Sequence, residues 1–119
     1  MKKLADEVRG ILRQSGPSPP ASGTITEFNA PGAGTGQDQG TLAYGINTSG
    51  VIAGEYLASD NVAHAFRRAA SGTITGFEVP GARGSSGQGT TALGINDADD
   101  IVGSYVDSSA LVHGFPQTP

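Results

Sequence analysis

The chain consists of two copies of one unit, and this internal repeat constrains the fold more than any other feature. Displacing the sequence by 49 residues aligns 22–70 with 71–119 without a gap, and 22 of the 49 paired positions are identical. The identities come in blocks; Gly45-Ile46-Asn47, for example, matches Gly94-Ile95-Asn96. Self-similarity at a period of about 20–50 residues indicates a repeat architecture, in which each unit buries its hydrophobic face against its neighbours.

Each unit has the pattern of four short β-strands. In the first unit, hydrophobic alternation predicts strands over 24–30, 41–47, 51–57 and 63–69. Asn47-Thr48-Ser49-Gly50 is typical of a hairpin turn, because Asn and Gly readily adopt turn conformations. Four antiparallel strands in every 40–50 residues or so is the pattern of a β-propeller blade. We therefore expect an all-β fold with two four-stranded antiparallel blade-like repeats, 22–70 and 71–119. A β-sandwich or a prism-like arrangement is the alternative.

The segment before the repeats has a different pattern. Its apolar residues are spaced as one stripe of an amphipathic α-helix, which predicts a helix over 1–15; they are Leu4, Val8, Ile11 and Leu12. A Pro/Ser-rich linker follows over 16–21 and would end the helix. Two interpretations of this helix remain open. It either contacts other chains in an oligomer or is a remnant of a longer protein.

Composition narrows the classes of partner. The chain carries 19 glycines and only 36% hydrophobic residues, but its regular strand alternation argues against disorder. A net charge of −4 argues against nucleic acid or an anionic membrane as the partner. The absence of cysteine excludes disulfides and thiolate metal sites. The longest apolar runs are only a few residues, too short for a membrane-spanning helix.

The conserved order of motifs within the two units resembles a known family. Both units contain Phe-x-x-Pro-Gly-Ala, then Gly-Thr-x-Ala-x-Gly-Ile-Asn, then Ile-x-Gly-x-Tyr, and then His64-Ala65-Phe66 or His113-Gly114-Phe115. Together these motifs resemble the bacterial HAF repeat, named for its His-Ala-Phe triplet, and the resemblance covers 22 to about 115. It implies β-propeller-like repeats and an extracellular or cell-surface location, although charged residues near Met1 interrupt any signal-peptide pattern. It supplies no catalytic residues, and family members carry more than two repeats.

Two repeats are too few to close a propeller, which needs roughly four to eight blades. A chain with two blades leaves exposed sheet edges, and such edges pair readily with another chain. A closed cyclic homo-oligomer would remove them, since three chains supply six blades and four chains supply eight. We therefore predict a homotrimer or homotetramer.

Two residue types recur at equivalent positions and are candidates for a binding site. His64 and His113 are the two histidines of the chain, and neither has other metal-type ligands nearby in the sequence. We expect each to make a structural hydrogen bond. Tyr56 and Tyr105 would either pack within the blades or, together with Tyr44 and Arg67, line a carbohydrate site. Tyr56, Tyr105, His64 and His113 are therefore the candidate ligand-binding residues, with no metal and no cofactor expected.

Motifs that suggest catalysis or ion binding are weak. Asn96–Asp100 resembles part of a Ca²⁺ loop, but the equivalent residues 47–51 lack every carboxylate, which favours a hairpin turn. The glycine-rich stretches lack the Lys-Ser/Thr ending of a phosphate loop. Ser108, His113 and Asp107 contain the residue types of a catalytic triad, but no nucleophile-elbow motif accompanies them. We predict a non-enzymatic module that self-assembles into a closed propeller-like homo-oligomer. The alternative is a ligand-binding propeller, with a glycan or a small molecule bound between blades.

Overall fold

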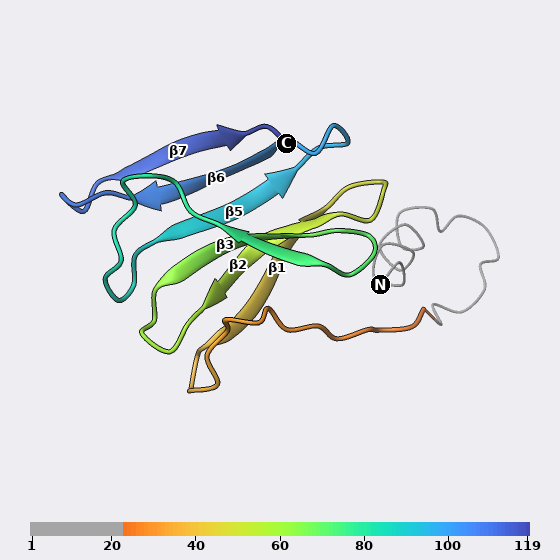
Figure 1. Ribbon diagram of the computed structural model, residues 1–119, viewed down its shortest axis with the longest axis horizontal. Coiled ribbons are helices and arrows are strands. Elements are labelled where there is room, and N and C mark those ends of the chain that lie inside the picture. The colour runs from red at the N-terminus through yellow and green to blue at the C-terminus, as the bar shows by residue number, and fades with distance from the viewer. Residues whose placement is uncertain (1–22) are drawn as a thin grey trace, which may run out of the picture.

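The computed structural model describes residues 23–119, which form two antiparallel β-sheets. Sheet A contains, in order, β1 (Gly40–Ile46), β2 (Ile52–Leu57), β3 (Ala63–Arg68) and β4 (Ile74–Phe77). Sheet B contains β5 (Thr90–Ile95), β6 (Ile101–Val106) and β7 (Val112–Gln117) (Figure 1). The all-β prediction is confirmed. The predicted helix over 1–15 and the linker over 16–21 lie outside the described residues, and the described part forms no closed ring. Nor does it contain a helix long and apolar enough to span a membrane.

The hairpin turn predicted between the second and third strands is confirmed in both repeats. Asn47 Oδ1 accepts hydrogen bonds from the backbone N–H groups of Ser49 and Val51, at 3.1 and 3.0 Å. In the second repeat Asn96 Oδ1 accepts the equivalent bonds. Gly50 has a positive φ of 89°, and Asp99 adopts a φ of 67° at the same position. An Asn at the start and a residue that tolerates positive φ at the end therefore define the turn.

The boundary between the sheets does not coincide with the boundary between the repeats. β4 belongs to the second repeat by sequence, yet it pairs with β3 of the first, with Ala65 opposite Phe77 and Arg68 opposite Ile74. The equivalent segment of the first repeat, 25–28, is not a strand, so the strand predicted over 24–30 is wrong. A strand requires a hydrogen-bonded neighbour, and no described strand lies beside this segment. Sheet B has three strands and not four, because no described segment pairs with β7 as β4 pairs with β3.

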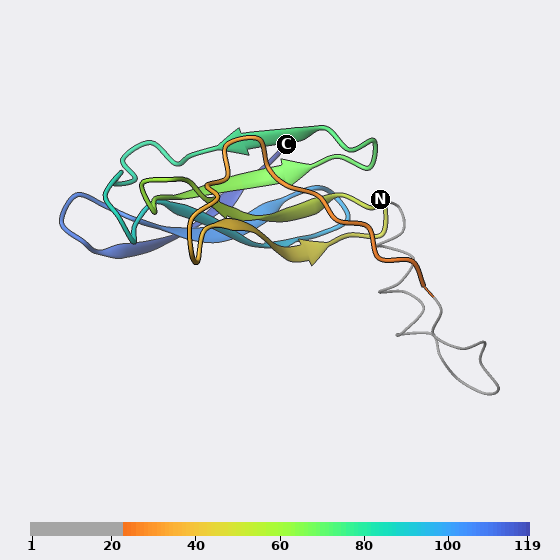
Figure 2. The same cartoon turned by 90° about the horizontal axis from the view of Figure 1, so that it is seen from below.

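The two sheets stack face to face, as Figures 1 and 2 both show. The core between them consists of small or branched side chains, each at most 1% exposed: Ala53, Ala65, Ala92 and Ile101. Phe77 and Ile95 pack against this cluster. Alanines from β2, β3 and β5 let the two backbones approach closely. Burial of a side chain such as Ile101 contributes about 1.5–3 kcal/mol to folding.

The chain that precedes β1 lies against the other face of sheet A (Figure 2). The Phe28 ring meets Phe66 of β3 edge-on, with ring centroids 6.0 Å apart and planes at 80°. One repeat later, Phe77 meets Phe115 of β7 at 6.2 Å and 84°. The N–H of Ala30 donates to Thr41 Oγ1 of β1 at 2.9 Å, which anchors the same segment. The aromatic packing therefore repeats even where the strand pairing does not.

Candidate functional site

The four predicted site residues lie together as two equivalent pairs, one on each sheet. Tyr56 of β2 is directly opposite His64 of β3, and their rings stack with centroids 5.0 Å apart and planes at 23°. Tyr105 of β6 and His113 of β7 stack in the same way, at 5.1 Å and 29°. Directly opposed residues on neighbouring strands have adjacent side chains, so the repeated Tyr and His spacing itself creates each stack.

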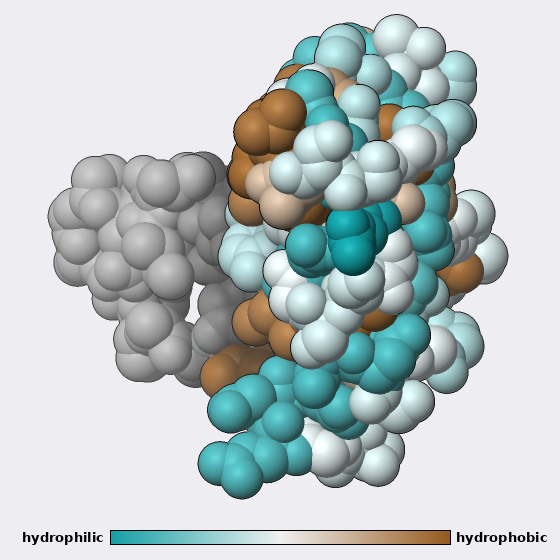
Figure 3. Space-filling model, turned by 90° about the vertical axis from the view of Figure 1, so that its left-hand side faces the viewer, coloured by the Kyte–Doolittle hydropathy of each residue, from teal (hydrophilic) through white to brown (hydrophobic). Residues whose placement is uncertain are grey.

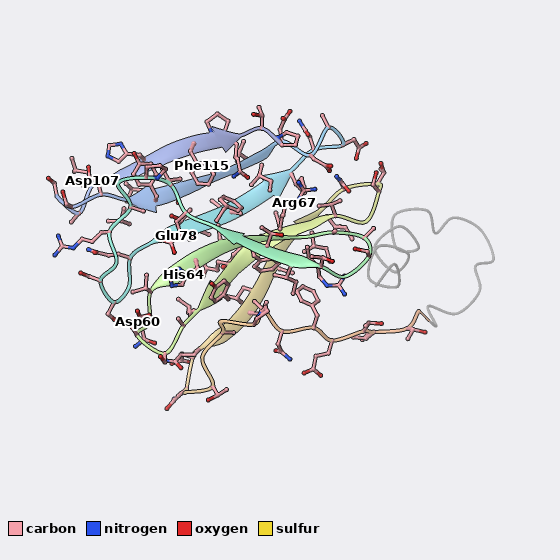
Figure 4. All side chains as sticks on the ribbon, in the orientation of Figure 1. Asp60, His64, Arg67, Glu78, Asp107 and Phe115 are labelled. Carbon is pink, nitrogen blue, oxygen red and sulfur yellow. The ribbon has the colours of Figure 1, made fainter. Side chains whose placement is uncertain are left out.

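Each histidine also contacts a carboxylate, but the two carboxylates come from different places. His64 Nδ1 lies 2.6 Å from Glu78 Oε2, just after β4, and the two residues are neighbours in Figure 4. His113 Nε2 lies 2.7 Å from Asp107 Oδ2, in the turn after β6. Sequence reasoning missed Glu78 because Asn29 stands at its equivalent position in the first repeat. The Tyr–His stack thus belongs to the repeat, whereas the carboxylate is particular to each sheet.

Asp107 holds both its own turn and the imidazole of His113. Its Oδ1 accepts hydrogen bonds from the N–H groups of Ser109 and Leu111, at 2.7 and 3.0 Å. The hydrogen bond to His113, followed by that from Leu111, lowers the pKa of Asp107 below its usual value. No hydrogen bond joins Ser108 to His113 in the described part of the chain, so the three residues with triad chemistry are not assembled as a triad.

The residues suggested for a carbohydrate site do not form one surface. Tyr56 and Arg67 project from opposite faces of sheet A, because side chains alternate along strands and Tyr56 pairs with His64 while Arg67 pairs with Ala53. The Tyr56 ring packs so close to Gly32 that a Cβ there would lie 2.9 Å from Tyr56 Cε1. On Tyr44, partial burial and the carboxylate of Glu55 raise the pKa. Tyr56 therefore has a packing role whether or not it binds a ligand.

The acidic turn that resembled a Ca²⁺ loop joins the two repeats. Asn47, only 6% exposed, donates through Nδ2 to the backbone oxygen of Asn96 at 3.0 Å and to Asp99 Oδ1 at 2.7 Å. Asp97 Oδ1 accepts from the N–H of Thr48 at 2.9 Å, and this bond lowers the pKa of Asp97. Within 23–119, no group of three His, Cys, Asp or Glu side chains is placed to hold a metal ion. These carboxylates instead accept hydrogen bonds from the preceding hairpin.

The outer face of sheet B is a second candidate site, which we call the open face and define as Val102, Val112, Gly114 and Pro116. The register of β6 and β7 places these residues on one side of the sheet. Val102 and Gly114 are the repeat equivalents of Ala53 and Ala65, which sheet B buries completely. By contrast, Val102 is 53% exposed and Val112 is 68% exposed. Figure 3 shows hydrophobic residues along one margin of the molecule, most densely in its upper part, at the level of sheet B.

No protein-family model, no curated protein and no solved structure matches this chain.

Proposed function

We propose that this protein is a non-enzymatic repeat module that assembles head to tail with copies of itself into a closed, β-propeller-like ring. The proposal rests on the contrast between two equivalent surfaces. Sheet B covers the face of sheet A that contains Ala53 and Ala65, whereas the same face of sheet B stays exposed at Val102 and Gly114. An exposed apolar face beside a sheet edge is the usual mark of an interaction surface.

The charges at the proposed contact are compatible with such stacking. Between sheets A and B, Arg67 Nη2 lies 3.4 Å from Asp99 Oδ2. If sheet B packed on sheet A of the next copy in the same way, Pro116 would take the place of Arg67, and Gly50 the place of Asp99. At the contact between copies, both the positive and the negative charge of this ion pair are therefore missing. The contact thus leaves neither member of this ion pair facing its neighbour without a partner.

The resemblance to HAF repeats supports the same arrangement. That resemblance implies β-propeller-like repeats of the kind found in secreted or surface proteins, and the blades of a propeller stack around a ring. With two repeats in each chain, three or four copies would supply the six or eight blades of an ordinary propeller.

Light scattering after gel filtration measures the mass that decides this proposal. We expect a trimer or tetramer. Val102→Glu should weaken assembly by placing a charge on the open face, whereas Ser86→Glu adds the same charge in an exposed loop and should not. A monomer at every concentration, or equal effects of the two substitutions, would refute the proposal.

A ligand-binding module is the second candidate, and the repeated Tyr–His stacks favour it. The His113 side chain is 43% exposed beside Tyr105, so a planar or sugar ligand could reach this pair. A thermal-shift screen against monosaccharides at millimolar concentration tests this function. Stabilisation that Tyr105→Ala abolishes would support it, and no stabilisation by any sugar would exclude a glycan ligand.

A further inference from the structure

The segment Ile25–Phe28 repeats the sequence and the position of β4 but lacks a strand partner. Ile25, Thr26 and Phe28 are identical to their equivalents in β4. Phe28 packs against sheet A through Phe66, just as Phe77 packs against sheet B through Phe115. The segment therefore lies, relative to sheet A, where β4 lies relative to sheet B. β4 is the outermost strand of the preceding sheet, so Ile25–Phe28 is positioned to be the outermost strand of a sheet that precedes sheet A.

The strand edge with which Ile25–Phe28 could pair is that of β7, at the other end of the molecule. β7 is the equivalent of β3, and among the described strands its one neighbour is β6. In Figure 1 the chain before β1 lies below sheet A and β7 lies at the top of the stack, so one copy does not pair the two within itself.

We infer that Ile25–Phe28 of one copy adds to sheet B of another as its fourth strand, antiparallel to β7. This inference rests on the proposed self-assembly and specifies the contacting segment and its register. The register follows from the pairing of β3 with β4, displaced by one repeat. It places Gly114 opposite Phe28, Phe115 opposite Glu27, Pro116 opposite Thr26 and Gln117 opposite Ile25.

The backbone of β7 can support this pairing despite Pro116. In β3, the N–H of Ala63 donates outward to Gln88 O at 2.7 Å, and just past the strand that of Ala69 donates to Thr73 O at 2.8 Å. Alternate residues of a strand point the same way, so Gly114 and Pro116 are the β7 positions that face outward. Pro116 lacks an N–H and removes one bond, but its carbonyl and both groups of Gly114 remain. A proline on an edge strand also limits unspecific pairing.

Gly40 provides an independent sign that a neighbour is needed. Its repeat equivalent Gly89, with φ +120°, lies against the backbone of Ala63, where a Cβ would overlap the carbonyl oxygen. Gly40 has nearly the same φ, +131°, but a Cβ there would meet nothing within 4 Å. In the inferred assembly Val112 of the next copy takes the place of Ala63. Gly40 then makes the same close approach as Gly89.

Disulfide trapping tests the register directly, because the chain contains no cysteine. Ile25 and Gln117 are expected to form a non-hydrogen-bonded pair with Cα atoms about 4.5 Å apart, within the range a disulfide can bridge. The Ile25→Cys/Gln117→Cys variant should yield disulfide-linked multimers that stop at the number of chains in the ring. In the matched control, Ile25→Cys/Ser109→Cys, the second cysteine lies in the exposed turn before β7, roughly 17 Å or more away along the strand. It should yield none.

The outcomes separate this inference from the proposed function. Multimers of the first variant alone, in a protein that light scattering shows to be assembled, support strand addition. An assembled protein without these multimers, with equal multimers in the control, or with a disulfide inside one chain would overturn strand addition and leave self-assembly standing. A monomeric protein without multimers would overturn both.

A pair of proline variants tests the same ladder without cysteines. Thr26→Pro removes an N–H that faces β7 in the inferred pairing, whereas Glu27→Pro removes one that faces away. Thr26→Pro should weaken association by about tenfold or more, the usual effect of losing one interface hydrogen bond together with local fit. Glu27→Pro should change it little, and equal effects would contradict the register.

Discussion

Replacing Gly89 with Ala tests how closely sheet B approaches sheet A, and Gly40→Ala is its matched control. Both glycines have positive φ, +120° and +131°, so alanine strains the backbone at either position. Only at Gly89 would the new Cβ overlap the carbonyl of Ala63. The same strand end is held by the bond from the Ala63 N–H to Gln88 O. Because this obstacle is backbone, it cannot move aside as a flexible side chain would.

The expected magnitude follows from these two contributions. Backbone strain at positive φ costs about 1–3 kcal/mol and applies to both variants. Overpacking at a tight contact costs a further 1–3 kcal/mol or so, and applies to Gly89→Ala alone. The free energy of unfolding should therefore be lower for Gly89→Ala than for Gly40→Ala by about 1–3 kcal/mol. With urea slopes of about 1–3 kcal/mol/M for small domains, the midpoints should differ by roughly 1 M.

Urea unfolding followed by far-ultraviolet circular dichroism measures this difference. Both variants should be compared at the lowest protein concentration that gives a signal, because self-assembly would otherwise add to the stability of the folded state. Equal midpoints for the two variants would refute the close approach of Gly89 to Ala63. In the light-scattering measurement of self-assembly, Gly40→Ala should have the larger effect of the two variants and weaken association.

Three further predictions concern polar groups. Arg68 is 8% exposed, its Nε and Nη1 have no hydrogen-bond partner in the described part of the chain, and its guanidinium lies 4.8 Å from the centroid of the Phe28 ring. Arg68→Met removes the unpaired N–H groups and also the cation–π contact, so the two effects should nearly cancel and the free energy of unfolding, measured in urea, should change by less than about 1 kcal/mol. Asp107 has a lowered pKa and so stabilises the fold above its ordinary pKa of about 3.9, an effect that is lost as the pH falls. Asp107→Asn should therefore flatten the loss of stability between about pH 5 and pH 2, and an unchanged profile would contradict this role. Asn47→Ala should lower the free energy of unfolding by about 2–4 kcal/mol, because it breaks the hydrogen bonds from Asn47 to the second hairpin. Asn96→Ala, which breaks a bond within its own hairpin, should lower it by about 1 kcal/mol. Equal losses would contradict the role of Asn47 in joining the two hairpins.

Features set by neighbours in the sequence were predictable. Strands β1, β2 and β3 appear where the hydrophobic alternation predicts them, because a residue's face on a strand depends only on its position along that strand. The turn at Asn47–Gly50 follows from residue types that favour its backbone angles. The stacking of Tyr56 on His64 also follows once the turn sets the register of two adjacent strands.

Features that depend on which strand meets which edge were not predictable in this way. The segments Ile25–Phe28 and Ile74–Phe77 have nearly the same sequence, yet only the second is a strand. The difference is the presence of β3 beside Ile74–Phe77, and backbone hydrogen bonding to a neighbour does not depend on side-chain identity. The contact of Glu78 with His64 likewise arises from the pairing of β4 with β3, and the bonds of Asp97 and Asp99 to the preceding hairpin arise from the stacking of sheet B on sheet A.

The sequence by itself thus determined the repeat, the local strands and the turns, because these depend on periodicity and on the backbone preferences of single residues. Only the tertiary structure decided where one sheet ends and the next begins, because a sheet is defined by long-range pairing. Because of that pairing, the last strand of sheet A comes from the second repeat. Ile25–Phe28 and β7 then lie at the two ends of the stack.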